Sequence, residues 1–389
     1  MKRLGWLVPL LIGVWGVTCA EAVAVPPGIN VKTNYGARGD GVADDTAALQ
    51  AAFNTLSSVA NSVYIPPGIY KVSSTLTVAD AQGFTIYGAG QTASQILPTT
   101  GVAGAAVVEF INCRDGVLWN LGILGYSPAP PSSGIEFHRA AYGGYAPTNM
   151  TVRDVLLGSV SANSLVAGVR WTADVDSNNS ESLIENVKVI NCQKAAYSIE
   201  HSNSLQHRII GGVIDCSSSP SSIGVLTHGG SFSMTGTTVA VSGTFVVVTG
   251  RQYHSLSIAN VSEEDGANIL WTSTDSAIDI SFTAYNKSGA KPNQSTIYFQ
   301  GKNGRFSMSS SNLNLGQPGE FAVFTDPGTV ARFRDSSLGI GHYWWAGRLV
   351  LSGNVHNTGA ITLTPANTSA AVAQWGDFNG SVGFMSTRQ

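Results

Sequence analysis

Charged side chains are scarce in this sequence. Asp, Glu, Lys and Arg make up 12% of its 389 residues, about half of the roughly 25% found in an average globular protein. The net charge is −3 and no basic stripe runs through the chain, so the electrostatic footprint of nucleic-acid binding is missing. Gly, Ser, Thr and Asn are abundant instead, and this composition favours an all-β chain with many turns.

Cysteine is also rare, with four in the chain. Cys19 belongs to the N-terminal segment that we expect to be cleaved off. Three cysteines then remain: Cys113, Cys192 and Cys216. This odd number argues against a disulfide framework and predicts at least one unpaired thiol. Cys192 and Cys216 are 24 positions apart, which is close to the interval of the internal repeats described below. We therefore expect their thiols to be buried and stacked on neighbouring repeats, with one disulfide as the alternative. Neither spacing is typical of a zinc site, and we expect no metal ligands.

Long apolar runs are missing after the first two dozen residues. A positive pair, Lys2 and Arg3, precedes the apolar stretch Leu4 to Val17, and small residues follow it. This arrangement is typical of a secretory signal peptide, which we place at residues 1–24. The stretch is shorter than the ~20 residues of a membrane span, with an uncleaved anchor as the alternative. We therefore expect a secreted protein, extracellular or periplasmic, with no membrane association after cleavage.

One segment, Asn34 to Val72, is specified in more detail than any other. Gly36, Gly39 and Gly41 supply positions where φ can be positive, so we expect an irregular turn from Tyr35 to Val42. A short helix and two strands should complete the segment.

That helix begins near a pair of acidic residues. Asp44 or Asp45 stands at its N-cap, and an apolar stripe from Ala48 onward predicts one buried face. Val63–Ile65 and Ile69–Val72 are expected to be short strands around a Pro-Pro-Gly turn. We interpret the acidic pair as a helix cap rather than as a catalytic or metal-binding site.

The runs GARGDGVADDTAALQAAF and YIPPGIYKV resemble the N-terminal signature of the pectate-lyase-like, or pectin-lyase-fold, superfamily. That superfamily is similar to polygalacturonase-type glycoside hydrolases and to viral tailspike depolymerases. The resemblance implies a single-stranded right-handed parallel β-helix whose first end is plugged by the short helix. It covers about a tenth of the chain and marks the cap rather than an active site.

Internal repetition supports the same all-β architecture. Short β-like runs recur at intervals of about 25 residues, and a second series interleaves with the first. Two or three parallel strands per coil should therefore bury their inward side chains in a continuous column. The first series begins at Val117, Met150, Leu183, Arg208, Phe232, Leu256, Ile278, Phe306 and Ala331, and the second at Gly134, Gly168, Tyr197, Ile223, Phe245, Asn268, Thr296 and Phe321.

The repeats divide the mature chain into one body and one end. We predict a parallel β-helix domain over residues 25–354, including the N-terminal cap 34–72. The rhythm loosens toward the end, and we predict a β-rich C-terminal cap at 355–389, because an open sheet end invites edge pairing. The longer early intervals predict projecting loops at 127–133 and 140–147. The oligomeric state stays open between a monomer and a homotrimer.

Catalysis in such a fold needs acidic and basic side chains that converge on one sheet. The resemblance offers two reactions: hydrolysis with clustered Asp residues, and elimination with calcium-binding carboxylates and an Arg or Lys base. The sequence lacks the hydrolase runs Asn-Thr-Asp, a second Asp-Asp and Gly-His-Gly, so no catalytic residue is carried over from the superfamily. We expect no cofactor, with calcium reserved for the case of a lyase.

The densest acidic cluster lies at Ser262–Gly266, just before a strand run. Crowding of like charges raises the pKa of a carboxyl group toward that of a general acid. Glu264 and Asp265 are therefore candidate catalytic residues. A solvated acidic turn is the alternative.

A second candidate cluster follows from the interleaved strands. Strand alternation turns Glu136, Arg170 and Glu200 outward on one face if their inward neighbours stack in register. We predict Glu136 and Glu200 as catalytic residues. Arg170, with His201 and His228 near the strand ends, would bind substrate. An exposed ladder of salt bridges is the alternative.

Exposed aromatic rings give sugars a surface on which to stack. Tyr343, Trp344 and Trp345 are consecutive, and alternation along a strand prevents all three rings from being buried on one face. We expect this run to bind substrate. Trp171 and Trp271 fall inside strand runs, where we expect them in the core.

Together these patterns predict a secreted protein that acts on an acidic, pectin-like polysaccharide or exopolysaccharide by hydrolysis or β-elimination. Hydrolysis is favoured because the sequence shows no strong calcium constellation. The competing prediction is a non-catalytic carbohydrate-binding or surface protein with the same fold.

Overall fold

The computed structural model describes the chain from residue 28 onward, with interruptions. The undescribed residues are 1–27, 57–60, 143, 160–163, 176–177, 251–253, 266, 273–276, 289–294, 315–320, 339–341, 346–347, 353–354, 358–360, 366–371, 376–381 and 385–389. The predicted signal peptide, residues 1–24, lies outside the described part. None of the described helices has the length and apolar character needed to cross a membrane.

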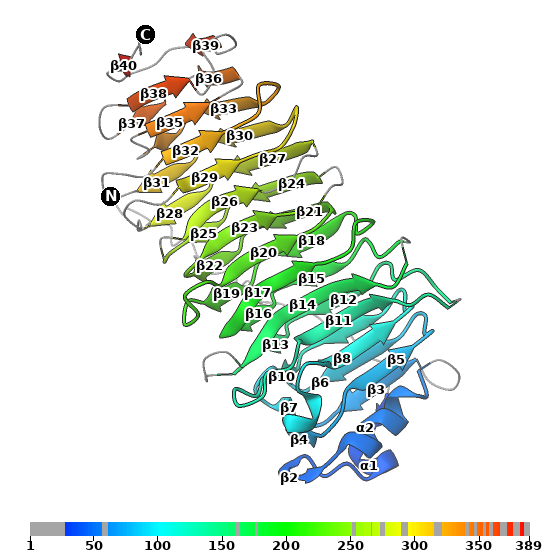
Figure 1. The fold of residues 1–389 in the computed structure, drawn as a ribbon. Coiled ribbons are helices and arrows are strands. Elements are labelled where there is room, and N and C mark those ends of the chain that lie inside the picture. The colour runs from blue at the N-terminus through cyan, green and yellow to red at the C-terminus, as the bar shows by residue number, and fades with distance from the viewer. Residues whose placement is uncertain are drawn as a thin grey trace, which may run out of the picture.

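Three long parallel sheets form the body of the protein, and each coil from β3 to β38 contributes one strand to each sheet (Figure 1). Sheet A contains β1 (Ile29–Asn30), β3 (Ser62–Ile65), β6 (Thr85–Gly88), β9 (Val117–Trp119), β12 (Thr151–Arg153), β15 (Leu183–Glu185), β18 (His207–Ile210), β21 (Gly230–Thr235), β24 (His254–Ala259), β27 (Ile278–Thr283), β30 (Arg305–Ser309), β33 (Val330–Arg334), β36 (Arg348–Ser352) and β39 (Val372–Trp375).

Sheet B contains β2 (Asp40–Asp44), β4 (Gly68–Val72), β7 (Ser94–Pro98), β10 (Gly122–Ile123), β13 (Leu156–Leu157), β16 (Lys188–Ile190), β19 (Val213–Cys216), β22 (Thr238–Val241), β25 (Ser262–Glu263), β28 (Asn286–Ser288), β31 (Asn312–Asn314), β34 (Ser337–Leu338) and β37 (His356–Asn357). Sheet C contains β5 (Leu76–Ala79), β8 (Ala106–Ile111), β11 (Ser133–Arg139), β14 (Leu165–Ala173), β17 (Cys192–Ile199), β20 (Ile223–Thr227), β23 (Thr244–Val248), β26 (Asn268–Thr272), β29 (Ser295–Phe299), β32 (Phe321–Phe324), β35 (His342–Trp345), β38 (Ile361–Pro365) and β40 (Val382–Phe384).

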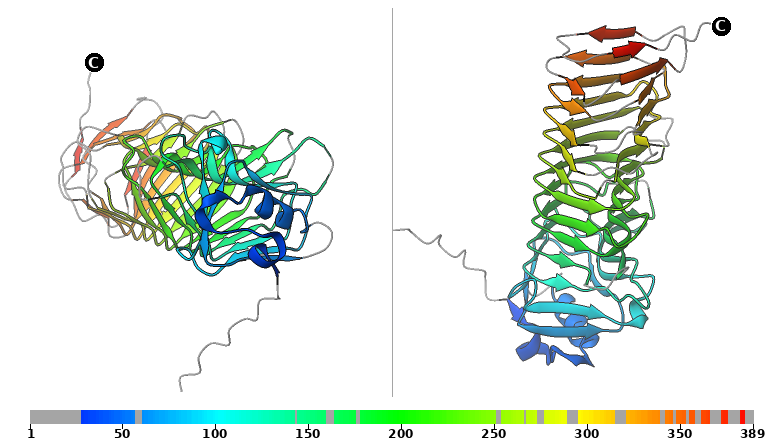
Figure 2. Two further views of the ribbon diagram at one scale, coloured as in Figure 1. Left: turned by 90° about the horizontal axis from the view of Figure 1, so that it is seen from below. Right: turned by 90° about the vertical axis from the view of Figure 1, so that its left-hand side faces the viewer.

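This architecture confirms the predicted parallel β-helix. The coils stack along one axis (Figure 2), and their inward side chains form a continuous apolar core. The two predicted strand series correspond to sheets A and C. Of sheet B only the strand Ile69–Val72 was predicted, which forms most of β4, and no repeated series was predicted for its other strands.

A repeated short corner joins sheet A to sheet B. From β9 to β34 two residues separate the two strands of each coil, and the first of them has a positive φ. Asn120, Asn186 and Asn260 hold this position with φ values of 58°, 50° and 52°. Asn adopts the left-handed region more readily than most residues, which explains part of the Asn content of the chain.

Two short helices close the first coil. Helix α1 spans Val31–Tyr35 and was not predicted, whereas α2 spans Thr46–Phe53 as expected and buries Leu49, Ala52 and Phe53. The expected irregular turn before α2 includes the start of strand β2, although its three glycines do have positive φ values.

The acidic pair before α2 acts as the cap prediction implies, but with divided roles. Asp45 occupies the N-cap position without capping the helix. Its carboxylate instead accepts from the backbone N–H groups of Arg38 at 2.6 Å and Gly39 at 2.9 Å. Asp44 accepts from the N–H of Thr46 at 3.0 Å. The pair therefore holds the turn and the helix start together.

Cys192 and Cys216 form a disulfide that links β17 to β19, with Cα atoms 5.1 Å apart. The expected stacked thiols are thus replaced by the disulfide alternative. Cys113 is buried and carries a free thiol, as the odd count predicted. Burial raises the pKa of this thiol to about 12, so it stays protonated and unreactive.

The last strands continue the same architecture. Strands β38 and β40 pair in parallel in sheet C, and β39 pairs with β36 in sheet A. The boundary between the body at 25–354 and a cap at 355–389 stays a prediction.

Candidate functional site

A ladder of buried aromatic rings underlies sheet C near its N-terminal end. Phe110, Phe137 and Trp171 pair in register on β8, β11 and β14, with ring centroids 5.6 and 5.8 Å apart. All three rings are fully buried. Asn179 ties two of these strands together, because its amide donates to the carbonyl of Phe137 at 2.9 Å and to that of Thr172 at 3.0 Å.

The residues that precede these rings face outward, since side chains alternate across a strand. Glu109, Glu136 and Arg170 therefore form one row on the outer face, each level with the next on neighbouring strands. The predicted outward placement of Glu136 and Arg170 holds in the structure.

Two carboxylates and an imidazole meet at the start of this row. Atoms of Glu109, Glu136 and His138 lie within 4.8 Å of one another, and all three side chains are half-buried. Burial raises the pKa of Glu109, and the negative charges of Glu136 and Asp174 raise it further against the opposing effect of His138. Glu109 consequently keeps its proton to a higher pH than an ordinary glutamate does.

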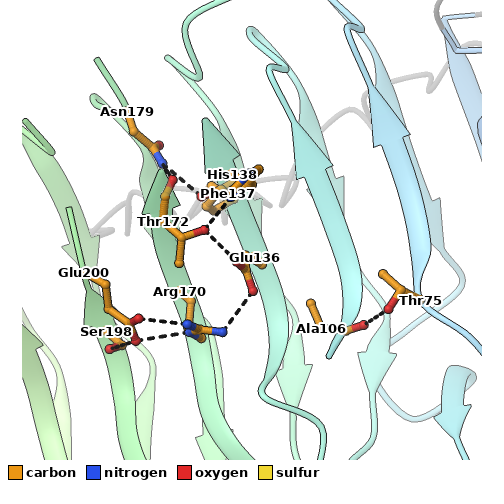
Figure 3. Close-up of polar contacts among 10 residues, drawn as sticks. All are labelled: Thr75, Ala106, Glu136, Phe137, His138, Arg170, Thr172, Asn179, Ser198 and Glu200. Carbon is orange, nitrogen blue, oxygen red and sulfur yellow. Dashed lines mark hydrogen bonds and ion pairs between the residues drawn. The ribbon is translucent and has the colours of Figure 1, made fainter. Parts of the chain in front are cut away.

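A polar network positions the carboxylate of Glu136 (Figure 3). The Thr172 hydroxyl donates to Glu136 Oε1 at 2.6 Å, and Arg170 Nη1 donates to Glu136 Oε2 at 3.2 Å. His138 Nδ1 lies 2.9 Å from the Thr172 hydroxyl, and its Nε2 lies 3.3 Å from Asp174 Oδ2. Both oxygens of Glu136 are therefore held by donors.

Arg170 joins this network to Glu200. Its Nε and Nη2 donate to the two carboxylate oxygens of Glu200 at 3.1 and 2.8 Å, a bidentate geometry that is among the stronger ion pairs. Burial alone would raise the pKa of Glu200, but the hydrogen bonds from Arg170 and Ser198 outweigh it and lower that pKa. The guanidinium is thus neutralised by two carboxylates of the protein itself.

The register of Glu200 differs from the prediction. Arg170 lies level with Ser198 rather than with Glu200, since β14 pairs with β17 at an offset of 28 residues (170 to 198) instead of the predicted 30 (170 to 200). Glu200 reaches Arg170 only through the length of the two side chains. The predicted face is right, and the predicted alignment is wrong by two residues.

The two predicted histidines are placed differently from each other. His201 is only 7% exposed, which removes it from contact with a polymer on the surface. His228 is exposed, and its Nδ1 lies 2.8 Å from the Thr249 hydroxyl. Desolvation lowers the pKa of His228, although the nearby Glu200 opposes this effect. His228 therefore belongs to the outer face of sheet C, next to Glu200.

The predicted acidic cluster is split by the fold. Glu264 and Asp265 are exposed beyond the end of β25 in sheet B, away from the row on sheet C. Glu263 is buried and pairs with Lys287 at 3.6 Å. Burial raises the pKa of Glu263 to about 7, against the opposing charge of Lys287. Glu263 points into the core and is inaccessible to substrate.

The predicted aromatic residues also separate. Tyr343, Trp344 and Trp345 lie on β35, which pairs with β32, but their side chains lie outside the described part of the structure. Trp171 is buried as expected. Trp271 is 41% exposed, so its core assignment was wrong: Leu270 takes the inward position on β26 and turns the next ring outward.

Four residues of the network were missed by the sequence analysis: Glu109, His138, Thr172 and Asp174. A signal for the first was present, because Glu-Phe occurs at 109–110 and again at 136–137, as well as at 320–321. The first two dipeptides occupy equivalent positions on β8 and β11. A search for repeated pairs, rather than for acidic density, would have found the two carboxylates together.

Glu109, Glu136 and His138 are also potential metal ligands. Two carboxylates and one imidazole can hold a divalent ion, but calcium prefers a cage of six to eight oxygens. A mixed oxygen and nitrogen set suits a transition metal better. This donor set therefore does not support the calcium expected for a lyase.

A separate surface depression lies on another sheet. A cavity of about 550 Å³ opens over sheet A, between Glu181, Arg208 and Ser233. Glu181 is the one carboxylate among the residues described around it, whereas the cluster on sheet C brings two carboxylates and an imidazole together. The cluster on sheet C therefore remains the better candidate for chemistry.

Comparisons with solved structures show the fold. The Agl-KA catalytic domain matches with a TM-score of 0.55 and 14% identity, over 94% of this chain and 69% of that one. Gene product 12 of bacteriophage phi29 matches with a TM-score of 0.48 and 14% identity, over 92% of this chain and 56% of that one. At such identities the likeness concerns the fold alone.

A short match to a curated protein and a family model add to this. "Non-secreted LysM effector LysM19" from Penicillium expansum is 42% identical over 71 residues, which is 18% of this chain and 5% of that protein. The chain thus matches only a small part of that relative. The model described as "Rhamnogalacturonase A/epimerase, pectate lyase-like" matches residues 28–269, more than half of the chain and all of the network on sheet C. The chain belongs to this rhamnogalacturonase A/epimerase, pectate lyase-like family.

Proposed function

We propose that the protein cleaves a polysaccharide on the outer face of sheet C, with Glu109 as proton donor and Glu136 as its partner carboxylate. The observation that carries this proposal is the pairing of a carboxyl of raised pKa with a carboxylate whose two oxygens are held by donors. Two acidic groups in contrasting environments are the usual arrangement for acid and base roles. The family membership supports a polysaccharide as substrate.

Hydrolysis of a glycosidic bond is the first candidate reaction. Glu109 would give its proton to the leaving oxygen as the glycosidic C–O bond breaks, while Glu136 forms a bond to the anomeric carbon. Water would then release the sugar and return a proton to Glu109. Their oxygens lie within 4.8 Å, nearer to the about 5–5.5 Å of retaining glycosidases than to the roughly 6.5–9.5 Å that admits a water.

β-Elimination on an acidic polysaccharide is the second candidate. His138, oriented by Asp174 at 3.3 Å, would remove the proton next to a uronic acid carboxylate. This reaction needs a cation to bind that carboxylate, and Arg170 is already paired with Glu136 and Glu200. The arrangement therefore supports hydrolysis more than elimination, and it gives no specific support to an acidic substrate.

We further propose that the protein works outside the cell. The disulfide between Cys192 and Cys216 supports this, because such bonds persist mainly in oxidising compartments. The predicted signal peptide at residues 1–24 is in line with it.

The test is an activity screen with matched variants. Purified protein is incubated with pectins, alginates and exopolysaccharides, and new reducing ends and the absorbance of unsaturated products are followed. Reducing ends without unsaturation support hydrolysis, and Glu109→Gln and Glu136→Gln should each abolish them. Product formation that survives both substitutions would refute the assignment. Binding without any product would favour the non-catalytic alternative.

A further inference from the structure

The outer face of sheet C changes character halfway along the molecule. Strands β8, β11, β14 and β17 each contain at least one charged residue, whereas β20, β23, β26, β29 and β32 contain no Asp, Glu, Lys or Arg. The proposed catalytic network occupies the charged half. The uncharged half begins directly beyond Glu200.

The two halves share one row of outward positions. Starting from Arg170, the strand register places these residues level with one another: Ser198, Leu226, Val247, Trp271 and Tyr298. Neighbouring strands are about 4.8 Å apart, so Trp271 lies about 19 Å from Arg170 along the axis of the β-helix. A polymer that follows this row from the charged half meets apolar side chains next.

Two aromatic rings dominate the uncharged half. Trp271 and Tyr298 are stacked, with ring centroids 6.3 Å apart and planes 20° from parallel. Trp271 is 41% exposed, although it sits in the middle of a strand in a continuous sheet. A large exposed ring next to other apolar groups is a typical mark of a binding surface.

A cavity of about 430 Å³ lies beside the exposed tryptophan. Its walls combine apolar side chains, including Ile223, Val247 and Trp271, with neutral hydrogen-bonding groups from Thr244 and Asn268. Ser221 and Ser242 also line the cavity, so polar and apolar side chains contribute about equally to its walls. A pyranose ring has one apolar C–H face and a rim of hydroxyls, which match an aromatic ring and neutral polar groups respectively.

We propose that this cavity is a subsite for uncharged sugar units of the polysaccharide that is cleaved at Glu109 and Glu136. The inference rests on the proposed function for the reacting end of the polymer, whereas the stacking on Trp271 stands by itself. The residues described around the cavity include no cation that could balance a uronate. The polymer would run across the strands, parallel to the axis of the β-helix.

The experiment is affinity electrophoresis of the whole protein in gels that contain xylan, arabinogalactan or β-1,3-glucan, and in parallel polygalacturonate or alginate. We expect at least one uncharged polymer to retard the wild type. Trp271→Ala should weaken this retardation about tenfold, the loss of one stacked ring, while Trp271→Phe should largely keep it. Thermal melting of each variant checks that it is folded.

Tyr87→Ala is the matched control, because Tyr87 also stacks on a neighbouring strand, with Tyr64 at 5.0 Å, but on sheet A. Retardation only by the charged polymers, none by any polymer, or equal loss in both alanine variants would overturn the subsite. Glu109→Gln separates the two proposals: it should stop cleavage and leave retardation unchanged. Cleavage that persists in this variant, with retardation lost in Trp271→Ala, would refute the proposed chemistry and keep the subsite.

Discussion

Glu109 and Glu136 occupy equivalent positions on β8 and β11, each directly before a buried phenylalanine of the same ladder. The stacked rings therefore bring two like charges together, which neither strand would favour alone. Burial, and then this repulsion, raise the pKa of Glu109. The position of the proposed acid is thus a product of core packing.

Glu109→Gln should lower kcat by roughly 10²–10⁴-fold, the usual contribution of a general acid. In the wild type, activity should fall as the pH rises through the raised pKa of Glu109, because the donor then loses its proton. The variant should lack this alkaline limb. The pH dependence of kcat measures both effects. Glu185→Gln on sheet A is the control, and an unchanged alkaline limb in Glu109→Gln would contradict the assignment.

Arg170→Met should lower the free energy of unfolding at neutral pH by about 1–3 kcal/mol, because it leaves the carboxylates of Glu136 and Glu200 without their partner. The folded-state pKa of Glu200 is lowered, so its contribution is present above the unfolded pKa and is lost as the pH falls through the folded one. The difference between variant and wild type should therefore shrink in acid.

Urea unfolding at pH 7 and at pH 3 checks this expectation. Arg170→Lys keeps the charge without the bidentate geometry and should fall between the two proteins. An equal difference at both pH values would mean that Arg170 stabilises the fold through packing rather than through its ion pairs.

Glu263→Gln should remove a component of the pH dependence of stability. The pKa of Glu263 is raised to about 7 in the folded state, so the folded protein binds more protons than the unfolded one between about pH 4.5 and 7. This component favours folding below that window and is lost as the pH rises through it. The melting temperature of the wild type should therefore decline across the window more than that of the variant.

A neighbour supplies the control for this measurement. Glu264 follows Glu263 directly but is exposed, so Glu264→Gln should keep the wild-type slope. Identical slopes in all three proteins would show that Glu263 ionises normally despite its burial.

Cys216→Ala should lower the free energy of unfolding by about 2–4 kcal/mol, the typical value for a disulfide. A reducing agent should destabilise the wild type by a similar amount and leave the variant unchanged. Chemical denaturation with and without reductant measures this. Cys113→Ala, which removes the buried free thiol, should keep the sensitivity to reductant. A wild type that ignores reductant would contradict the assigned bond.

The sequence predicted the fold from two signals that depend on local chemistry. The cap segment combines glycine turns with an apolar helix, and the strands of sheets A and C are long enough for alternation to be visible. Most strands of sheet B were missed, because a strand as short as Gly122–Ile123 shows no alternation of apolar and polar residues. The existence of sheet B follows only from stacking between coils.

The site was harder to predict because it depends on register. The outward direction of Glu136 follows from its own strand, but the alignment of Arg170 with Ser198 rather than with Glu200 depends on the length of chain between β14 and β17, which no local pattern reveals. Acidic density pointed to Glu264, since sequence proximity does not tell which carboxylate turns into the core. Trp271 was wrongly assigned to the core, because its strand alone does not show whether Leu270 or Trp271 points inward.

The two-residue corner between sheets A and B constrains how such a chain can vary. Because it stays the same length from β9 to β34, an insertion there would break the left-handed turn and the stacking of two sheets at once. The other two connections of each coil differ widely in length, as between β11 and β12 or between β13 and β14. Both of these variable connections, from sheet B to sheet C and from sheet C to sheet A, border sheet C. Loops could therefore lengthen, shorten or change in sequence on either side of the proposed binding face while the three parallel sheets stay intact.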